Sequence, residues 1–83
     1  MAGTKDPLNV ERGARVRAAR LEHGWTQDEL ADKANITRQA LSLIELGDVA
    51  PRDDLKVRLA QALGSRQADL FPYPEDLEPA VLA

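Results

Sequence analysis

The sequence predicts an all-α fold, a compact bundle of five helices. Apolar residues recur at the three- and four-residue spacing of helices that bury one face. Two threonines, Thr26 and Thr37, stand where they can cap helix N-termini. Between the predicted helices lie residues that tolerate a left-handed backbone: Gly24, Asn35, Gly47 and Gly64.

The chain divides into an arm, a folded domain and a tail. Residues 1–9 are expected to form a flexible arm, because Pro7 and its polar neighbours oppose a helix. The domain is expected over residues 10–71, and its first helix over about residues 10–23. Residues 72–83 form an acidic, proline-rich tail, in which neither a helix nor a central strand fits residues 72–79.

The C-terminal half of the domain is expected to hold two helices. The first of them should begin near Pro51, a favoured first-turn residue, and end at Gly64. Its apolar stripe consists of Leu55, Leu59, Ala62 and Leu63. Ser65 is expected to cap the last, short helix, after which Leu70 and Phe71 close the core.

Residues 26–47 predict two short helices joined by a tight turn. Thr26 and Glu29 have the spacing of a capping box, and Asn35 suits the strained turn between the helices. The second helix, after Thr37, buries one face and leaves a polar face outward: Arg38, Gln39 and Ser42, with Leu43 beside them. Arginine can bind guanine O6 and N7, and glutamine can bind adenine N6 and N7. This is the layout of a helix-turn-helix that binds duplex DNA.

The sequence closely resembles the Cro and phage-repressor type of helix-turn-helix, the XRE-like family, over roughly residues 10–71. Matching positions are Arg20, Gly24, Thr26, Gln27, Leu30, Ala31, Ile36, Thr37, Ile44, Glu45, Gly47, Pro51, Leu59, Ala60, Ala62, Leu63 and Gly64. The resemblance is specific because several independent elements occur in the right order. It implies a lambda-repressor-like DNA-binding domain whose third helix enters the major groove.

The resemblance also implies roles for individual residues. Gln27 matches the family's phosphate-binding residue at the start of the second helix. Arg20 and Glu45 match an ion pair that ties the first helix to the end of the third. The implied base contacts are Arg38, Gln39 and Leu43, and the implied supporting or phosphate contacts are Thr37 and Ser42.

Four positions bear on how far this resemblance extends. Asp48 lies in a loop that is often basic in the family, where it would repel phosphate if it faced DNA. Leu43 replaces a polar base-contacting residue, so it either contacts a thymine methyl or makes no base contact. Arg52 is a candidate for a phosphate or narrow minor-groove contact, with a solvated position as the alternative. Lys56 occupies a position that is commonly apolar and leaves the register of its helix open.

The charge balance is the main argument against DNA binding. The chain has 11 basic and 14 acidic side chains, a net charge of −3, unlike the basic footprint of most nucleic-acid binders. Residues 1–52 are neutral in sum, however, and the excess acid lies in residues 53–83. Basic residues of the first helix soften the objection: Arg12, Arg15, Arg17 and Arg20. We therefore expect weak nonspecific binding and a strong need for paired half-sites.

Other classes of function find little support. There is no cysteine, and the single His23 cannot form a metal centre alone, so we expect no metal and no cofactor. No nucleophile, acid and base stand in a pattern that predicts an enzyme. The sequence has no apolar stretch long enough for a membrane span or a signal peptide, so a cytoplasmic protein, nucleoid-associated through DNA, is expected.

Two hypotheses follow. The leading one is a sequence-specific transcriptional regulator, such as a repressor, that binds a palindromic or repeated operator as a homodimer. Its dimer contact is expected in exposed apolar side chains near the C-terminus: Leu70, Phe71 and Tyr73. The alternative is a protein-interaction module, such as an antitoxin or accessory factor, that docks on a protein partner through the acidic C-terminal tail.

Overall fold

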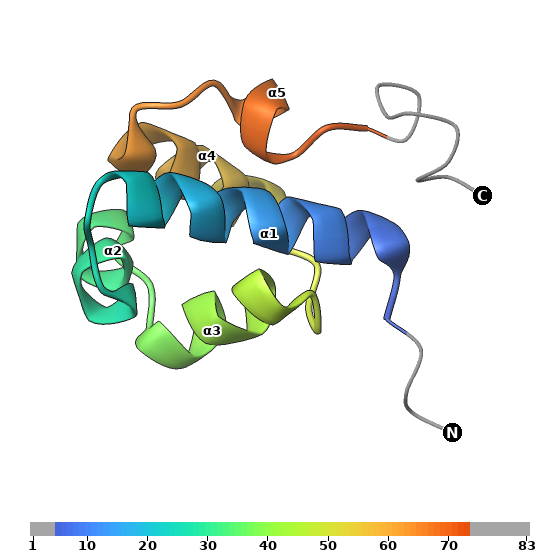
Figure 1. Cartoon of the computed structure of the whole chain (residues 1–83), viewed down its shortest axis with the longest axis horizontal. Helices are drawn as coiled ribbons and strands as arrows, with labels where there is room; N and C mark the ends of the chain where they lie inside the picture. Colours follow the sequence, from blue (N-terminus) through green and yellow to red (C-terminus); the bar gives the residue numbers. More distant parts are fainter. Residues whose placement is uncertain (1–4, 74–83) are drawn as a thin grey trace.

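Five helices follow one another along residues 5–73, the part of the chain that the computed structural model describes (Figure 1). They are α1 (Pro7–Glu22), α2 (Gln27–Ala34), α3 (Arg38–Leu46), α4 (Asp53–Leu63) and α5 (Gln67–Leu70). No strand occurs among these residues. The predicted all-α fold of five helices is confirmed.

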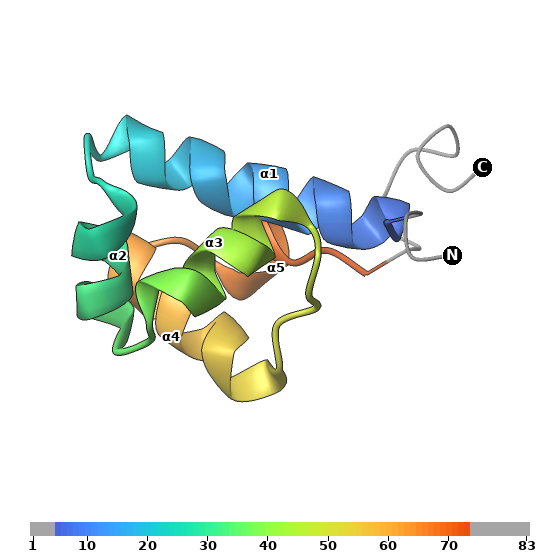
Figure 2. The ribbon, with the colours of Figure 1, turned by 90° about the horizontal axis from the view of Figure 1, so that it is seen from below.

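The core is a single cluster to which every helix contributes. Helix α1 packs against α3 on one side and against α4 and α5 on another, while α2 packs against α3 and α4 (Figures 1 and 2). The four largest fully buried side chains come one from each of the first four helices: Val16, Leu30, Leu41 and Leu59. Small residues of α2, Ala31 and Ala34, are also buried there and let the neighbouring helices approach closely.

Gly13 sets the distance between α1 and α3. A Cβ atom at this position would lie 2.3 Å from the carbonyl oxygen of Ile44 and 2.6 Å from that of Glu45. Such distances are far below van der Waals contact, so only glycine allows the two backbones to come this close. This packing role of Gly13 was not predicted from the sequence.

The N-terminal arm is shorter than predicted. Helix α1 begins at Pro7, because Asp6 caps it by accepting a hydrogen bond from the Leu8 N–H at 2.9 Å and proline suits the first turn. Lys5 is also held, since its Nζ donates to the Leu46 carbonyl at 2.8 Å and lies 3.3 Å from Asp48. A flexible arm extending to residue 9 is therefore wrong for residues 5–9, and residues 1–4 lie outside the described part.

Helices α4 and α5 begin later than predicted. Pro51 lies before α4, whose N-cap is Arg52, and the N-cap of α5 is Arg66 rather than Ser65. Neither arginine makes a side-chain cap bond. The register of α4 is nevertheless clear, because the aliphatic stem of Lys56 fills the apolar position and leaves its side chain 11% exposed.

The folded domain extends past residue 71. Arg12 is buried and donates from Nε and Nη2 to the Pro72 carbonyl at 3.2 and 3.0 Å. Arg15 donates to the Asp69 carbonyl at 3.0 Å. Pro72 thus belongs to the domain and not to the tail, of which residues 74–83 lie outside the described part.

Candidate nucleic acid interface

The α2–turn–α3 unit is fixed at each of its helix ends. The Thr26 hydroxyl accepts the Glu29 N–H at 3.1 Å, and the Glu29 carboxylate accepts the Thr26 N–H at 2.9 Å, so the predicted capping box is confirmed. Hydrogen bonding of the Glu29 carboxylate to the backbone and, to a lesser degree, to the side chain of Thr26 lowers the pKa of Glu29. Asn35 ends α2 in the left-handed conformation with φ of 57°, as predicted. Thr37 then caps α3 through a bond from the Ala40 N–H at 3.0 Å.

Glu45 ties three elements together at the inner side of α3. Its carboxylate accepts two hydrogen bonds from Arg20, from Nε at 2.8 Å and from Nη2 at 3.0 Å, and one from the Gln27 amide at 3.1 Å. Arg20 also donates to the Trp25 carbonyl at 2.8 Å. The hydrogen bonds to Glu45 raise the pKa of Arg20. The ion pair that the resemblance implied is present and holds α1, the start of α2 and the end of α3 in one geometry.

The opposite face of α3 is open to solvent. Arg38 and Gln39 are exposed, Ser42 is half-buried, and the three line one shallow depression on the surface. Leu43, four residues after Gln39, is 37% exposed beside them. Figure 2 shows α3 in front of the other helices on this side of the molecule. The predicted base-contacting residues therefore share one accessible surface.

Two predicted backbone-contacting residues already have partners. The Gln27 amide gives one of its two N–H groups to Glu45, which leaves the other for a phosphate. The Thr37 hydroxyl is the acceptor in the α3 cap, so its remaining capacity is as a donor. Ser42 lies at the edge of the α3 face, and Arg52, with a side chain 81% exposed, stands at the start of α4.

The charges near this surface are partly paired. Arg38 lies 3.7 Å from Asp28, and Arg52 lies 3.8 Å from Asp54. Both pairs are exposed and therefore weak, so each guanidinium can turn to a phosphate or a base at little cost. Asp48, which would repel DNA, is paired with Lys5.

The arginines of α1 do not form the basic footprint that the sequence analysis invoked. Arg12 and Arg20 are buried, Arg15 is half-buried and bonded to Glu11 and Asp69, and of the four only Arg17 is exposed. The positive charge of α1 is used mainly within the domain, because these guanidinium groups are donors to its own carbonyl and carboxylate oxygens.

The predicted dimer contact is also revised. Leu70 and Phe71 are each only 3% exposed and belong to the core, where α5 brings them against α1 and α4. They cannot form a surface contact as the sequence analysis supposed. Tyr73 alone of the three is exposed, at 59%.

The described residues form neither a membrane-spanning helix nor a metal site. None of their helices combines the length and apolar character that a membrane span requires. Within residues 5–73, no three carboxylate, imidazole or thiol side chains converge to hold a metal ion.

Two short helices locked at a left-handed turn, with the second presenting an exposed arginine and glutamine, define a helix-turn-helix DNA-binding domain. The family model described as helix-turn-helix matches residues 16–70. The chain belongs to this family of DNA-binding transcription regulators, which are not enzymes.

Several relatives have similar length and fold. An uncharacterised helix-turn-helix transcriptional regulator of Methanothermobacter thermautotrophicus is 40% identical over 62 residues, which cover 74% of this chain and 90% of that protein. The restriction-modification controller protein C.AhdI of Aeromonas hydrophila superposes with a TM-score of 0.73 at 28% identity, covering 76% of this chain and 96% of the other. The clp gene regulator ClgR of Corynebacterium glutamicum gives 0.71 at 32% identity, covering 76% and 82%.

Proposed function

We propose that this protein recognises a specific double-stranded operator as a homodimer, with α3 in the major groove. The observation that carries the proposal is the contrast between the two faces of α3. Its inner face is fixed by Leu41, Ile44 and Glu45, all buried, while Arg38 and Gln39 stand exposed on the outer face. A rigid helix that presents side chains able to form paired hydrogen bonds to bases suits sequence recognition.

Each exposed residue has a role that follows from its chemistry. Arg38 is assigned to guanine and Gln39 to adenine, while Leu43 contacts an apolar base substituent. Backbone contacts, which fix the register without selecting a sequence, are assigned to Gln27, Thr37, Ser42 and Arg52.

A second copy of the chain is assigned to an apolar surface at the C-terminal end of α3. Leu46 at the end of α3 is 54% exposed, and Val10 of α1 is 42% exposed. Val10 lies directly beside the end of α3, since a Cβ atom on Gly47 would be only 2.8 Å from the Val10 Cα. These side chains and Tyr73 replace the buried Leu70 and Phe71 as the proposed contact. Leu46→Asp should weaken dimerisation in sedimentation equilibrium. The matched control is Leu21→Asp on α1, where leucine is 50% exposed, and equal dimer affinity in both variants would remove this surface from the proposal.

The recognition surface is tested by selecting duplexes from a random DNA pool at ~100 mM salt. The wild type should enrich a sequence with two half-sites, and the variant Arg38→Ala, Gln39→Ala should not. The matched control is Arg66→Ala, Gln67→Ala at the N-terminal end of α5, which also removes one exposed, carboxylate-paired arginine and its neighbouring glutamine, but far from α3 (Figure 1).

Three outcomes distinguish the possibilities. Enrichment that is lost only in the α3 variant supports sequence-specific recognition by α3. Enrichment that survives in that variant refutes the assignment of Arg38 and Gln39. If the wild type enriches no sequence, specific DNA recognition fails, and the earlier alternative of a protein-interaction module takes precedence.

A further inference from the structure

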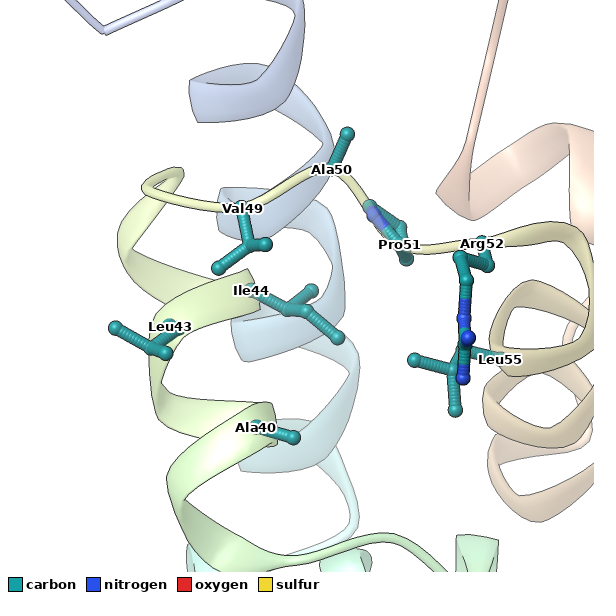
Figure 3. A pocket seen from close by; sticks show the side chains of 8 residues that line it. All are labelled: Ala40, Leu43, Ile44, Val49, Ala50, Pro51, Arg52 and Leu55. Atoms are coloured by element: carbon teal, nitrogen blue, oxygen red, sulfur yellow. The ribbon is translucent and has the colours of Figure 1, made fainter.

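An apolar hollow adjoins the exposed face of α3 (Figure 3). It lies between α3, the loop after it and the first turn of α4, and has a volume of about 220 Å³. Its lining is almost wholly aliphatic and includes Ala40, Leu43, Ile44, Val49, Pro51 and Leu55. Because Ile44 is buried and Leu43 is exposed, the hollow runs from the core edge to the outer surface.

The hollow is placed where DNA would cover it. Leu43 forms one rim and lies four residues, about one helical turn, after Gln39 on α3. The opposite rim is Arg52, whose guanidinium is free to meet a phosphate once it leaves Asp54. With α3 in the major groove, the hollow would therefore face the bases next to those that Arg38 and Gln39 contact.

Duplex DNA offers one apolar group that matches this lining. Along the major-groove edges of the bases, the groups are hydrogen-bond donors, acceptors and the C5-methyl group of thymine. A donor or acceptor that faced the aliphatic lining would lose its water without gaining a partner. Burial of the methyl group instead lowers the free energy of the complex, because apolar surface leaves water. The charges also match, since Arg52 on the rim can pair with the phosphate that flanks the base.

We infer that this hollow receives the C5-methyl group of a pyrimidine, which in unmodified DNA is thymine. The inference rests on the proposed function and adds a specificity element that the hydrogen-bonding side chains of α3 do not supply. A cavity of about 150 Å³ lined by aliphatic and aromatic side chains accommodates benzene, so an aliphatic hollow of about 220 Å³ has room for a methyl group. Cytosine methylated at C5 presents the same group and should fit as well.

The test uses the two-half-site duplex that the selection experiment returns. Each thymine is replaced in turn by uracil, which keeps every hydrogen-bonding group of the base and removes only the methyl. One thymine position of the half-site should be sensitive to this replacement. Uracil at that position in a single half-site should weaken binding about fourfold, as expected for one buried methyl-sized group, and uracil in both half-sites should weaken it about sixteenfold.

Two protein variants show whether the hollow is responsible. In Leu43→Ala, the preference for thymine over uracil at that position should fall to nearly one. Leu21→Ala is the matched control, since this leucine is also partly exposed but lies on α1 away from the hollow, and it should keep the full preference. At the same position, cytosine should bind more tightly after methylation at C5 in the wild type and not in Leu43→Ala.

The other outcomes overturn the inference in distinguishable ways. If the pool yields a specific sequence but no uracil replacement weakens binding, the methyl contact is absent while the proposed function stands. If the uracil effect is unchanged in Leu43→Ala, the methyl is read elsewhere. If Leu43→Ala and Val49→Ala weaken self-association measured without DNA, the hollow holds a second copy of the chain. If the pool yields no specific sequence, the proposed function fails and this inference fails with it.

Discussion

Replacement of Glu45 by alanine should destabilise the domain strongly. The side chain of Arg20 is 10% exposed and that of Glu45 is 3% exposed, so Glu45→Ala leaves a buried guanidinium without its carboxylate. Gln27 loses its acceptor as well. Removal of one partner from a buried ion pair usually costs about 3–5 kcal/mol. We expect the lower end, about 3 kcal/mol, because Arg20 keeps its bond to the Trp25 carbonyl.

The effect is measurable by thermal and urea unfolding followed by circular dichroism. For a domain of this size, a loss of about 3 kcal/mol lowers the melting temperature by roughly 12–24 °C. The variant Arg20→Met, Glu45→Leu, which removes both charges and fills the space, should recover most of the stability. The control is Asp69→Ala, which opens the exposed pair with Arg66 and should change the melting temperature very little.

A small effect would refute the reasoning. If Glu45→Ala melted within about 4 °C of the wild type, the pair would contribute no more than an exposed one. The same result would mean that the angle between α1 and α3 is fixed by packing alone. If the double variant instead proved as unstable as Glu45→Ala, the loss would come from shape and not from the unpaired charge.

Three further predictions concern the remaining constraints on the domain. Gly13→Ala should lower the free energy of unfolding by about 2 kcal/mol or more in urea titrations, because the added methyl group meets the backbone of α3. In the control Gly24→Ala, the added methyl group has nothing within 4 Å, so only the backbone strain at φ of +74° should remain, about 1 kcal/mol. Equal losses in the two variants would contradict the close approach of α1 and α3. Arg12→Ala should speed amide hydrogen exchange around Pro72 more than elsewhere, and uniform exchange would exclude the anchoring role. The pKa of Glu29 is lowered in the folded state, so its carboxylate stabilises the fold fully above the unfolded-state pKa, and this contribution is lost as the pH falls through the lower folded-state pKa. When stability is measured against pH, Glu29→Gln should lose less stability than the wild type between these two pKa values. An unchanged pH profile would contradict this.

The helix pair was predictable because its determinants are local. The capping box, the left-handed Asn35 and the Thr37 cap each depend on residues within three or four positions of one another. The start of α1 follows the same rules, since Asp6 before Pro7 is a strong N-terminal signal, whereas the predicted flexible arm counts Pro7 only as a residue that opposes a helix. The burial of Leu70 in the core was expected, yet it was also given a surface role that burial excludes.

The remaining features depend on contacts between distant parts of the chain. The bonds from Arg12 to Pro72 span 60 residues, and that from Lys5 to Leu46 spans 41. No spacing rule predicts which carbonyl an arginine or lysine will meet at such separations. A glycine inside a predicted helix, such as Gly13, often has a packing reason, but the partner backbone is known only from the fold. The aliphatic hollow likewise needs the loop after α3 to be placed against α4.

The folded domain has no net positive charge to attract DNA, because residues 5–73 carry 11 basic and 11 acidic side chains and the net charge of −3 belongs to the whole chain. Three of the four arginines of α1 are donors to oxygens of the domain itself, so they stabilise the fold instead of attracting phosphate. The outer face keeps few cations, chiefly Arg38 and Arg52, and each lies beside a carboxylate. Since sequence-independent binding grows with the number of phosphates neutralised, this surface should hold random DNA weakly and depend little on salt. Discrimination then has to come from base edges and methyl groups, and adequate affinity from two half-sites bound together.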